Sequence, residues 1–468
     1  MPPTILTVID RDGAKKPFNP GEMKDSIKRA MVMVDRNPKK DFDAPAERFQ
    51  REVVDELQRR NNNGDPIHVE RVQEVLLDVL HRDMARGTDS YFSKPEALWM
   101  RCMLDGEGHK LRQSGLLPQE CVSTIPVEKV SASRSWCKKH RCGTVKDLND
   151  WFQRGETKKL ISLSENRFDE QLLDVACELD RRIDDGSLRA VLITGPTASG
   201  KTTTTKKIAK LLSFFRPDVA FKPLEMDNYF KGANANEKLV YEIDGKIVED
   251  VNFELPESYD IDLINEHLKS LLEGRVVMVP KYDFASSTRS PGRATPFCLE
   301  EREILLIDCM HALSPQLTEA IPNGKKFKIY LEAISTLEDN AGRNVPWTDV
   351  RIMRRLIRDS RTRGHSFETT FWHWHLVRKG ERFVLPYMQT ADSIIDSGLP
   401  YELPILKRFI ERGVQDVLPK FERNPCLFDG RERARRVLRL LSQLQTASED
   451  QIERVPEDSI LREFIGSS

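Results

Sequence analysis

The pattern of apolar and polar positions divides the chain into a helical N-terminal part and a later part in which strands alternate with helices. Near the N-terminus, a short apolar run covers Ile5–Ile9, and a cluster of turn formers covers 61–66. Two sets of apolar residues recur there at helical spacing: Met23, Ile27, Ala30 and Met31, then Val69, Val72, Val75, Leu76, Val79 and Leu80. We therefore expect a small, mostly helical unit over residues 1–105.

From residue 190 onward, short apolar runs alternate with amphipathic helical patterns, which is typical of an α/β fold with a parallel sheet flanked by helices. Four runs predict strands: Ala190–Thr194, Val219–Met226, Ile304–Asp308 and Phe327–Leu331. Before them, a connector and a helical segment cover residues 106–185. The α/β domain is predicted over 186–425, and a C-terminal helical extension over 426–468.

The C-terminal extension combines an apolar stripe with many arginines. The stripe consists of Val437, Leu438, Leu440, Leu441 and Leu444. The arginines around it are Arg431, Arg433, Arg435, Arg436 and Arg439. We interpret the pattern as an amphipathic helix with a solvated basic face, in preference to a membrane-surface or partner helix.

Charge and composition narrow the class of protein. Lys and Arg total 73 against 74 Asp and Glu, so the formal net charge is −1 although 31% of residues are charged. This balance argues against a nucleic-acid partner, and no apolar run approaches the roughly 20 residues that span a membrane. An early charged residue in the N-terminus argues against a secretory signal, and eight scattered cysteines favour a reducing compartment. We expect a cytoplasmic protein without a membrane partner.

The most specific chemical signal follows the strand predicted over Ala190–Thr194. The residues Gly195, Pro196, Thr197, Ala198, Ser199, Gly200, Lys201 and Thr202 match GxxxxGK[ST], and together with Thr203 they are expected to bind the nucleotide. Such glycines let backbone N–H groups turn inward, and the helix N-terminus adds its positive dipole end. We expect Lys201 to reach the β- and γ-phosphates of ATP and Thr202 to bind Mg²⁺. The alternative is an ordinary glycine-rich turn between a strand and a helix.

Further motifs follow this loop in a fixed order. They are Glu225–Phe230, Asn252–Pro256, Val279–Phe284, Thr288–Arg289 and Arg351–Gly364. Together they resemble the uridine kinase and phosphoribulokinase-like family of P-loop nucleoside kinases, over residues 190–411. Tyr387–Pro404 and Pro456–Ile465 also match bacterial-type members that carry an extra N-terminal domain. The resemblance implies an ATP- and Mg²⁺-dependent kinase that phosphorylates a small molecule, the 5′-hydroxyl of a nucleoside, and we expect a homo-oligomer.

The resemblance and the residue chemistry assign roles to two aspartates. Asp227 follows a predicted strand and occupies the position that the family uses for the base that receives the hydroxyl proton. Its alternative role is a helix N-cap. Asp308 ends another predicted strand and is expected to hold Mg²⁺ together with Thr202. The family usually has Glu-Gly where this chain has Asp308-Cys309, so direct and water-mediated coordination both stay open.

The segment from Arg351 to Arg363 holds six arginines and one aspartate in 13 residues. A solvated helix face would interleave glutamates, whereas these planar donors suit several phosphate oxygens. We therefore expect Arg355, Arg358 and Arg363 to form a catalytic lid that closes over the transferring phosphate and excludes water. An ordinary surface helix is the alternative.

The predicted substrate site rests mainly on the resemblance. It consists of Asp227, Tyr229, Glu254, Tyr282, Phe284, Arg289 and Arg355. Glu254 stands where the family has an aspartate that binds ribose hydroxyls, and Tyr282 and Phe284 would form aromatic walls, with core packing as their alternative. Ser287 and His365 replace a histidine and an arginine of the family, so the base preference is not carried over.

The N-terminal unit resembles the ATP-cone, a regulatory nucleotide-binding module, over residues 4–100. The resemblance rests on Val8–Gly13, on Phe18 and on the helix that follows. Two usual lysine positions of the module are Asp10 and Glu22 here, and reversed charge opposes phosphate binding. An allosteric nucleotide site and a role in assembly are therefore both open.

A cysteine and histidine cluster suggests a zinc site. Cys137, His140 and Cys142 lie within six residues, and Cys121 lies upstream. The spacing lacks a second well-placed pair, so we favour residues without a metal.

Two other functions stay open. One is a kinase for another hydroxylated metabolite, such as a phosphosugar or phosphoglycerate, whose phosphate could meet the extra arginines. The other is a nucleotide-sensing regulator with a non-catalytic kinase domain. The set Lys201, Thr202, Asp227 and Asp308 argues against the regulator.

Overall fold

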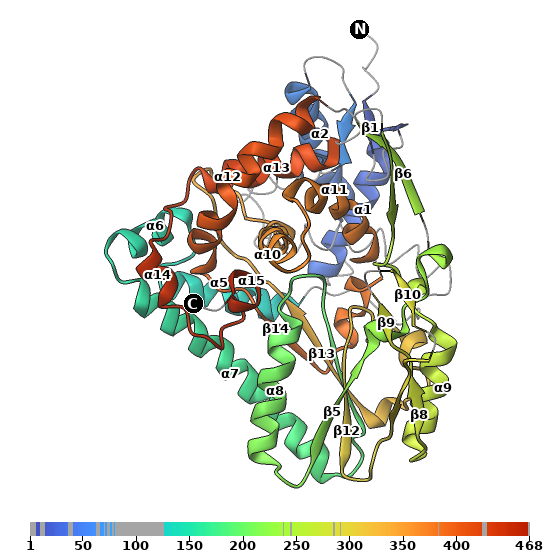
Figure 1. Ribbon diagram of the computed structural model, residues 1–468. Coiled ribbons are helices and arrows are strands. Elements are labelled where there is room, and N and C mark those ends of the chain that lie inside the picture. Colours follow the sequence, from blue (N-terminus) through green and yellow to red (C-terminus); the bar gives the residue numbers. More distant parts are fainter. Residues whose placement is uncertain are drawn as a thin grey trace.

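The central element is a parallel sheet of five strands in the order β14-β13-β4-β12-β5 (Figure 1). Its strands are β4 (Ala190–Thr194), β5 (Ala220–Glu225), β12 (Glu303–Asp308), β13 (Lys326–Glu332) and β14 (Ser393–Asp396). The computed structural model describes residues 6–9, 15–35, 41–61, 66–69, 71–72, 75–76, 79, 126–236, 238–243, 246–283, 286–290, 292–381, 383–423 and 428–466. The predicted α/β class is confirmed, and β14 is a strand that the sequence pattern did not predict.

Helices cover both faces of this sheet, which is why most residues of its inner strands are buried. In β12, Ile304 and Leu306 pack into one core, whereas Leu305 and Ile307 pack into another. The first core includes α7 (Thr157–Asp184) and α8 (Lys201–Phe215), and the second includes α9 (Ile261–Leu272). Figure 1 shows α8 and α9 on opposite sides of β5 and β12.

A helical layer lies beyond the carboxyl ends of the strands (Figure 1). It consists of α10 (Trp347–Thr362), α11 (Phe367–Glu381), α12 (Glu402–Arg423), α13 (Phe428–Leu441), α14 (Glu449–Glu453) and α15 (Arg462–Ile465). These helices share the first core with α6 (Val145–Gln153) and with Cys137 of α5 (Val127–Lys139). The C-terminal helical extension therefore packs against the sheet domain.

The basic face of α13 differs from the expectation of full solvation. Arg433 is only 1% exposed, and both Nε and Nη2 of Arg436 lie 2.6 Å from the Asp349 carboxylate. Arg435 remains at the surface, where it pairs with Glu422. The face is partly buried because α13 packs against α11 and α12, and acidic groups of the layer neutralise it.

The remaining elements of this domain are short antiparallel strand pairs and 3-10 turns. Antiparallel pairs join β6 (Lys238–Ile243) with β7 (Lys246–Val251), β8 (Val277–Val279) with β11 (Thr295–Phe297), and β9 (Tyr282–Asp283) with β10 (Thr288–Arg289). The 3-10 turns are η2 (Met226–Tyr229), η3 (Ala233–Ala235), η4 (Pro256–Ser258), η5 (Pro315–Thr318), η6 (Asn323–Lys325) and η7 (Leu385–Thr390). Of these, η2 matters most for the site, because it follows β5 directly.

The N-terminal unit has a core of its own. A three-stranded sheet of β2 (Lys15–Pro17), β1 (Thr7–Ile9) and β3 (Ile67–His68) accompanies α1 (Pro20–Asp35) and α2 (Asp43–Arg60). Ile27, Phe49 and Val53 are buried between these elements, together with Val75 and Val79 of the second predicted helix. Within the ranges that the structure describes, no helix is long and apolar enough to cross a membrane.

Candidate active site

The loop between β4 and α8 is tightly packed, and its two glycines are required by the geometry. A Cβ at Gly195 would lie 2.4 Å from the Leu331 carbonyl oxygen. Gly200 has φ +92°, in the left-handed region, and a Cβ there would lie 2.7 Å from Ile460. Ala198 also has a positive φ, of 58°. The backbone of the predicted phosphate loop is therefore held in a conformation that other residues would strain.

The polar groups of this loop fit a phosphate ligand. The Lys201 ammonium donates to the Gly195 and Pro196 carbonyl oxygens at 3.0 and 3.2 Å, so it lies along the loop. The Ser199 hydroxyl is buried and has no hydrogen-bond partner among the described residues. The first N–H groups of α8 have no intrahelical acceptors, as at any helix N-terminus, and an anion can bind there.

The strand register brings the two predicted aspartates to the same edge of the sheet. Asp308 pairs with Ile193 at the end of β4 and with Glu225 at the end of β5. Asp227 follows Glu225 by two residues, in η2. Burial, with smaller contributions from Glu463 and Asp227, raises the pKa of Asp308 to about 6, against the opposing effect of Lys201 and of a hydrogen bond with Thr202.

These groups also fit a magnesium ion. In the described part of the chain, no group of three or more His, Cys, Asp or Glu residues is arranged to hold a metal. Mg²⁺ does not need such a cage, because it commonly takes one or two protein oxygens and fills its other positions with water and phosphate oxygens. Thr202, in the first turn of α8, and Asp308, at the end of β12, would supply those protein oxygens.

Asp227 is placed to act on a ligand. Its side chain is reached by solvent, yet it lies deep among protein atoms, and this desolvation raises its pKa. The positive charges of Arg363 and Lys201 oppose that shift and so favour the carboxylate form. An N-cap role is not seen, since Asp227 lies inside the first turn of η2 and the N-cap position is held by Glu225.

Two arginines of α10 contact the same hydroxyl group of the phosphate loop. Arg355 Nη1 lies 3.1 Å and Arg358 Nη2 lies 3.4 Å from the Thr197 Oγ1 atom. Arg355 also pairs with Glu254 and Asp359, each at 2.9 Å. Arg358 is less well neutralised: burial, then the charges of Arg363 and Arg355, lower its pKa to about 10.

The other arginines of α10 occupy different environments. Arg351 and Arg354 are buried, where Arg351 pairs with Glu332 and Glu381, and Arg354 pairs with Glu402. Both also donate to loop carbonyl oxygens, of Thr197 and Ala198, at 3.3 Å. By contrast, the Arg363 side chain is 48% exposed and contacts Asp359 at 3.4 Å. Arg351 and Arg354 therefore support the phosphate loop from within the core, whereas Arg363, which directly follows α10, is half exposed.

Glu254 lies where α10 and α11 meet the site. Burial alone would raise its pKa, but Arg355 and His373 outweigh that effect and hold the pKa below its ordinary value. His373 Nε2 lies 3.7 Å from the Glu254 carboxylate. The backbone is equally constrained, because a Cβ at Gly380 would lie 2.2 Å from the Glu254 carbonyl oxygen.

The other predicted substrate residues lie mainly in the second core. Tyr229 is fully buried, and its hydroxyl lies 3.0 Å from His267 Nδ1. Arg289 donates to the Tyr229 and Phe230 carbonyl oxygens and pairs with Asp260. These two residues support the Asp227 loop; the structure does not bring them beside the phosphate loop.

Tyr282, the predicted aromatic wall, is buried among other rings. Its ring centroid lies 5.7 Å from that of Phe230 and 6.4 Å from that of Phe253, edge-on in both cases. Phe284 lies outside the described residues. This packing agrees with core packing of Tyr282, the alternative to an aromatic wall of the substrate site. Phe253 lies beside it and is only partly buried.

The structure adds Glu463 to the site, a residue that the sequence reasoning missed. Its carboxylate Oε2 accepts from the Thr203 backbone N–H at 3.2 Å and from the Thr203 hydroxyl at 2.9 Å. The likeness of Pro456–Ile465 to family members was the available signal, but likeness alone does not tell which element a tail contacts.

Two other predicted sites, the cysteine and histidine cluster and the ATP-cone-like unit, lie only partly within the described residues. His140 ends α5, where its ring packs 4.4 Å from Trp136, and the Cys142 thiol lies 3.6 Å from the Cys137 carbonyl oxygen. Cys121 lies outside the described residues, and so does Asp10 of the ATP-cone-like unit. Glu22 lies in the first turn of α1 and is exposed.

Comparison with known proteins agrees with this geometry. The profile of the phosphoribulokinase/uridine kinase family matches residues 190–402, and that of the ATP cone domain matches residues 6–93. A uridine kinase of Borrelia turicatae is 30% identical over 217 residues, which cover 45% of this chain and 87% of the relative. A uridine kinase of Clostridium perfringens is 29% identical over 233 residues, which cover 49% of this chain and 96% of the relative.

One solved structure was also similar over part of the chain. It is described as a fructose transport system kinase from Silicibacter sp. TM1040, with 16% identity and a TM-score of 0.31 over 47% of this chain and 98% of the other. A likeness at that level carries no inference.

The sheet, the phosphate loop and the family match define a small-molecule kinase, a phosphotransferase that acts on a hydroxyl group. The chain belongs to the phosphoribulokinase/uridine kinase family and carries an ATP cone domain at its N-terminus.

Proposed function

We propose that the protein transfers the γ-phosphate of ATP to the 5′-hydroxyl of a nucleoside. The observation that carries the proposal is the register of the sheet, which sets Asp308 at the end of β12 beside the phosphate loop and Asp227 just beyond the end of β5. Ligands of open parallel sheets bind at these carboxyl ends. The relatives described as uridine kinases support a nucleoside as the acceptor.

In this proposal each residue has a chemical role. The Asp227 carboxylate accepts the proton of the 5′-hydroxyl as the hydroxyl oxygen bonds to the γ-phosphorus. The bond between that phosphorus and the bridging oxygen of ADP breaks. Lys201 and Arg358 stabilise the negative charge on the phosphate oxygens, and Arg363 joins them when the lid closes.

Metal and acceptor binding complete the assignment. Thr202 and Asp308 would hold Mg²⁺, which when bound neutralises phosphate charge. Glu254 would accept hydrogen bonds from the ribose hydroxyls while Arg355 holds its carboxylate in place. A homo-oligomer, and a nucleotide effector at the ATP cone domain, stay predictions.

A substrate panel tests the proposal. The protein is incubated with Mg·ATP and, one at a time, with nucleosides, their 5′-deoxy analogues, phosphosugars and phosphoglycerate, and both ADP and the product are measured. We expect a nucleoside 5′-monophosphate to form in the same amount as ADP, and no phosphorylated product from the 5′-deoxy analogues. Product from only a phosphosugar or phosphoglycerate would overturn the nucleoside assignment, and ATP binding without turnover would indicate a regulator.

A further inference from the structure

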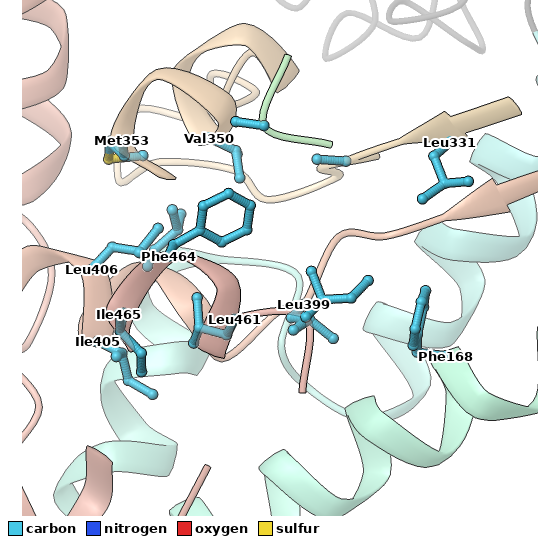
Figure 2. Close-up of a cluster of buried hydrophobic side chains, with 14 of the residues drawn as sticks. Phe168, Leu331, Val350, Met353, Leu399, Ile405, Leu406, Leu461, Phe464 and Ile465 are labelled. Carbon is cyan, nitrogen blue, oxygen red and sulfur yellow. The ribbon is translucent and has the colours of Figure 1, made fainter. Parts of the chain in front are cut away.

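The last eleven described residues, 456–466, which we call the C-terminal segment, lie directly on the phosphate loop. Ile460 approaches Gly200 so closely that a methyl group at that glycine would overlap with it. Leu461, Phe464 and Ile465 are buried in the main core. Figure 2 shows these three side chains in a cluster with Met353 of α10 and Leu406 of α12. The segment is therefore a fixed part of the wall around the loop.

From this position, Glu463 reaches the first turn of α8. One carboxylate oxygen accepts from both the N–H and the hydroxyl of Thr203, at 3.2 and 2.9 Å. Thr203 is the third residue of α8, so its N–H is one of the donors that the helix itself leaves unsatisfied. These are the donors that a phosphate group uses when it binds at the N-terminus of a helix.

A carboxylate and a phosphate cannot both take this N–H and this hydroxyl. Two negative groups at contact distance would also repel each other strongly in a partly buried site. Glu463 has an alternative partner, because its other carboxylate oxygen lies 4.0 Å from Arg358 Nη1. The ion pair of Arg358 Nε with Asp359 is long, at 3.5 Å. A rotation of the Glu463 side chain toward Arg358 would therefore free Thr203 and give the arginine a second, closer carboxylate.

We propose that Glu463 is a built-in competitor of the nucleotide: it occupies the Thr203 donors when the phosphate loop is empty and turns to Arg358 when a nucleotide phosphate binds. The proposal rests on the proposed use of ATP as donor and concerns the regulation of that site. The carboxylate thus lowers the affinity for nucleotide and links its binding to the position of α10, which carries Arg355 and Arg358.

The test is the binding of Mg·ATP, without acceptor, to the full chain by calorimetry. Glu463→Gln keeps an oxygen that can accept from Thr203 but removes the charge that opposes phosphate. Glu457→Gln is the matched control, because Glu457 lies in the same segment with its side chain 61% exposed. We expect Glu463→Gln to lower the Kd for Mg·ATP about three- to ten-fold, and Glu457→Gln to leave it unchanged. Inorganic tripolyphosphate should show the same gain, since the competition concerns phosphate alone.

An unchanged or higher Kd in Glu463→Gln would show that Glu463 only caps α8, and would overturn the proposal while leaving the ATP donor intact. Absence of ATP binding in both proteins would instead overturn the ATP donor, and the competitor with it.

Discussion

Arg355 Nη1 lies 2.9 Å from Glu254 Oε1, although the two residues are 101 positions apart in the sequence. The same guanidinium contacts the Thr197 hydroxyl and pairs with Asp359. One side chain thus connects the proposed acceptor site with the phosphate loop. Because all these groups are largely buried, we expect the loss of this arginine to lower the stability of the fold measurably.

Replacing Arg355 with Met should destabilise the fold by about 3–5 kcal/mol, because it leaves two buried carboxylates without their partner. The free energy of unfolding is measured in urea for Arg355→Met, for Glu254→Gln and for the double variant. The double variant should lose at least about 1 kcal/mol less than the sum of the two single losses. Arg363→Met is the matched control and should lose less than about 1 kcal/mol, since Arg363 is half exposed. Additive losses at Arg355 and Glu254 would contradict the pairing.

Removing the proposed metal ligand should change the dependence on magnesium. Asp308→Asn should raise the Mg²⁺ concentration needed for half-maximal turnover by about ten-fold or more. Glu303→Gln is a suitable control, because Glu303 lies at the opposite end of the same strand, where it pairs with Lys222. An Mg²⁺ titration that is the same for Asp308→Asn and wild type would remove Asp308 from the metal site.

His311 makes the stability of the fold depend on pH. Burial lowers its pKa from 6.5 to about 4, and its Nε2 lies 2.9 Å from the Glu254 carbonyl oxygen. Between these two pH values the unfolded chain binds a proton that the folded protein does not, so stability falls as the pH drops through 6.5 toward 4. From pH 7.5 to pH 5, the residue should account for about 2 kcal/mol of lost stability.

Urea unfolding at these two pH values checks this effect. The variant His311→Gln keeps a donor for the carbonyl oxygen but cannot titrate, so its pH-dependent loss should be smaller by that amount. His365→Gln should remove a smaller part of the loss, because desolvation lowers the pKa of the exposed His365 less than that of the buried His311. If the free energy of unfolding depended equally on pH in wild type and in His311→Gln, His311 would be protonated equally in the folded and unfolded states.

The strands were the most predictable part of the fold. The runs of β4, β12 and β13 are mostly buried and rich in apolar residues, and each was predicted to within one residue of its observed ends. β14 has only four residues, and the β6–β7 hairpin mixes apolar with charged residues, so neither gives a clear apolar run.

The arginine run shows what the sequence could not predict. Its surplus of positive charge suggested donors for phosphate, yet Arg351 and Arg354 are neutralised by Glu332, Glu381 and Glu402. These acids lie on three other elements, and only the fold brings them to α10. The contact of Glu463 with Thr203 escaped prediction for the same reason, since it spans 260 residues.

The central claim is that Asp227 takes the proton from a nucleoside hydroxyl during phosphate transfer. The most direct test is a single-turnover reaction of γ-labelled ATP with uridine, in wild type and in Asp227→Asn, with ATP affinity measured in parallel. The account predicts labelled 5′-monophosphate in wild type, transfer slowed by about 10²–10⁴ in the variant, and nearly equal ATP affinity. Transfer by Asp227→Asn at close to the wild-type rate would contradict it.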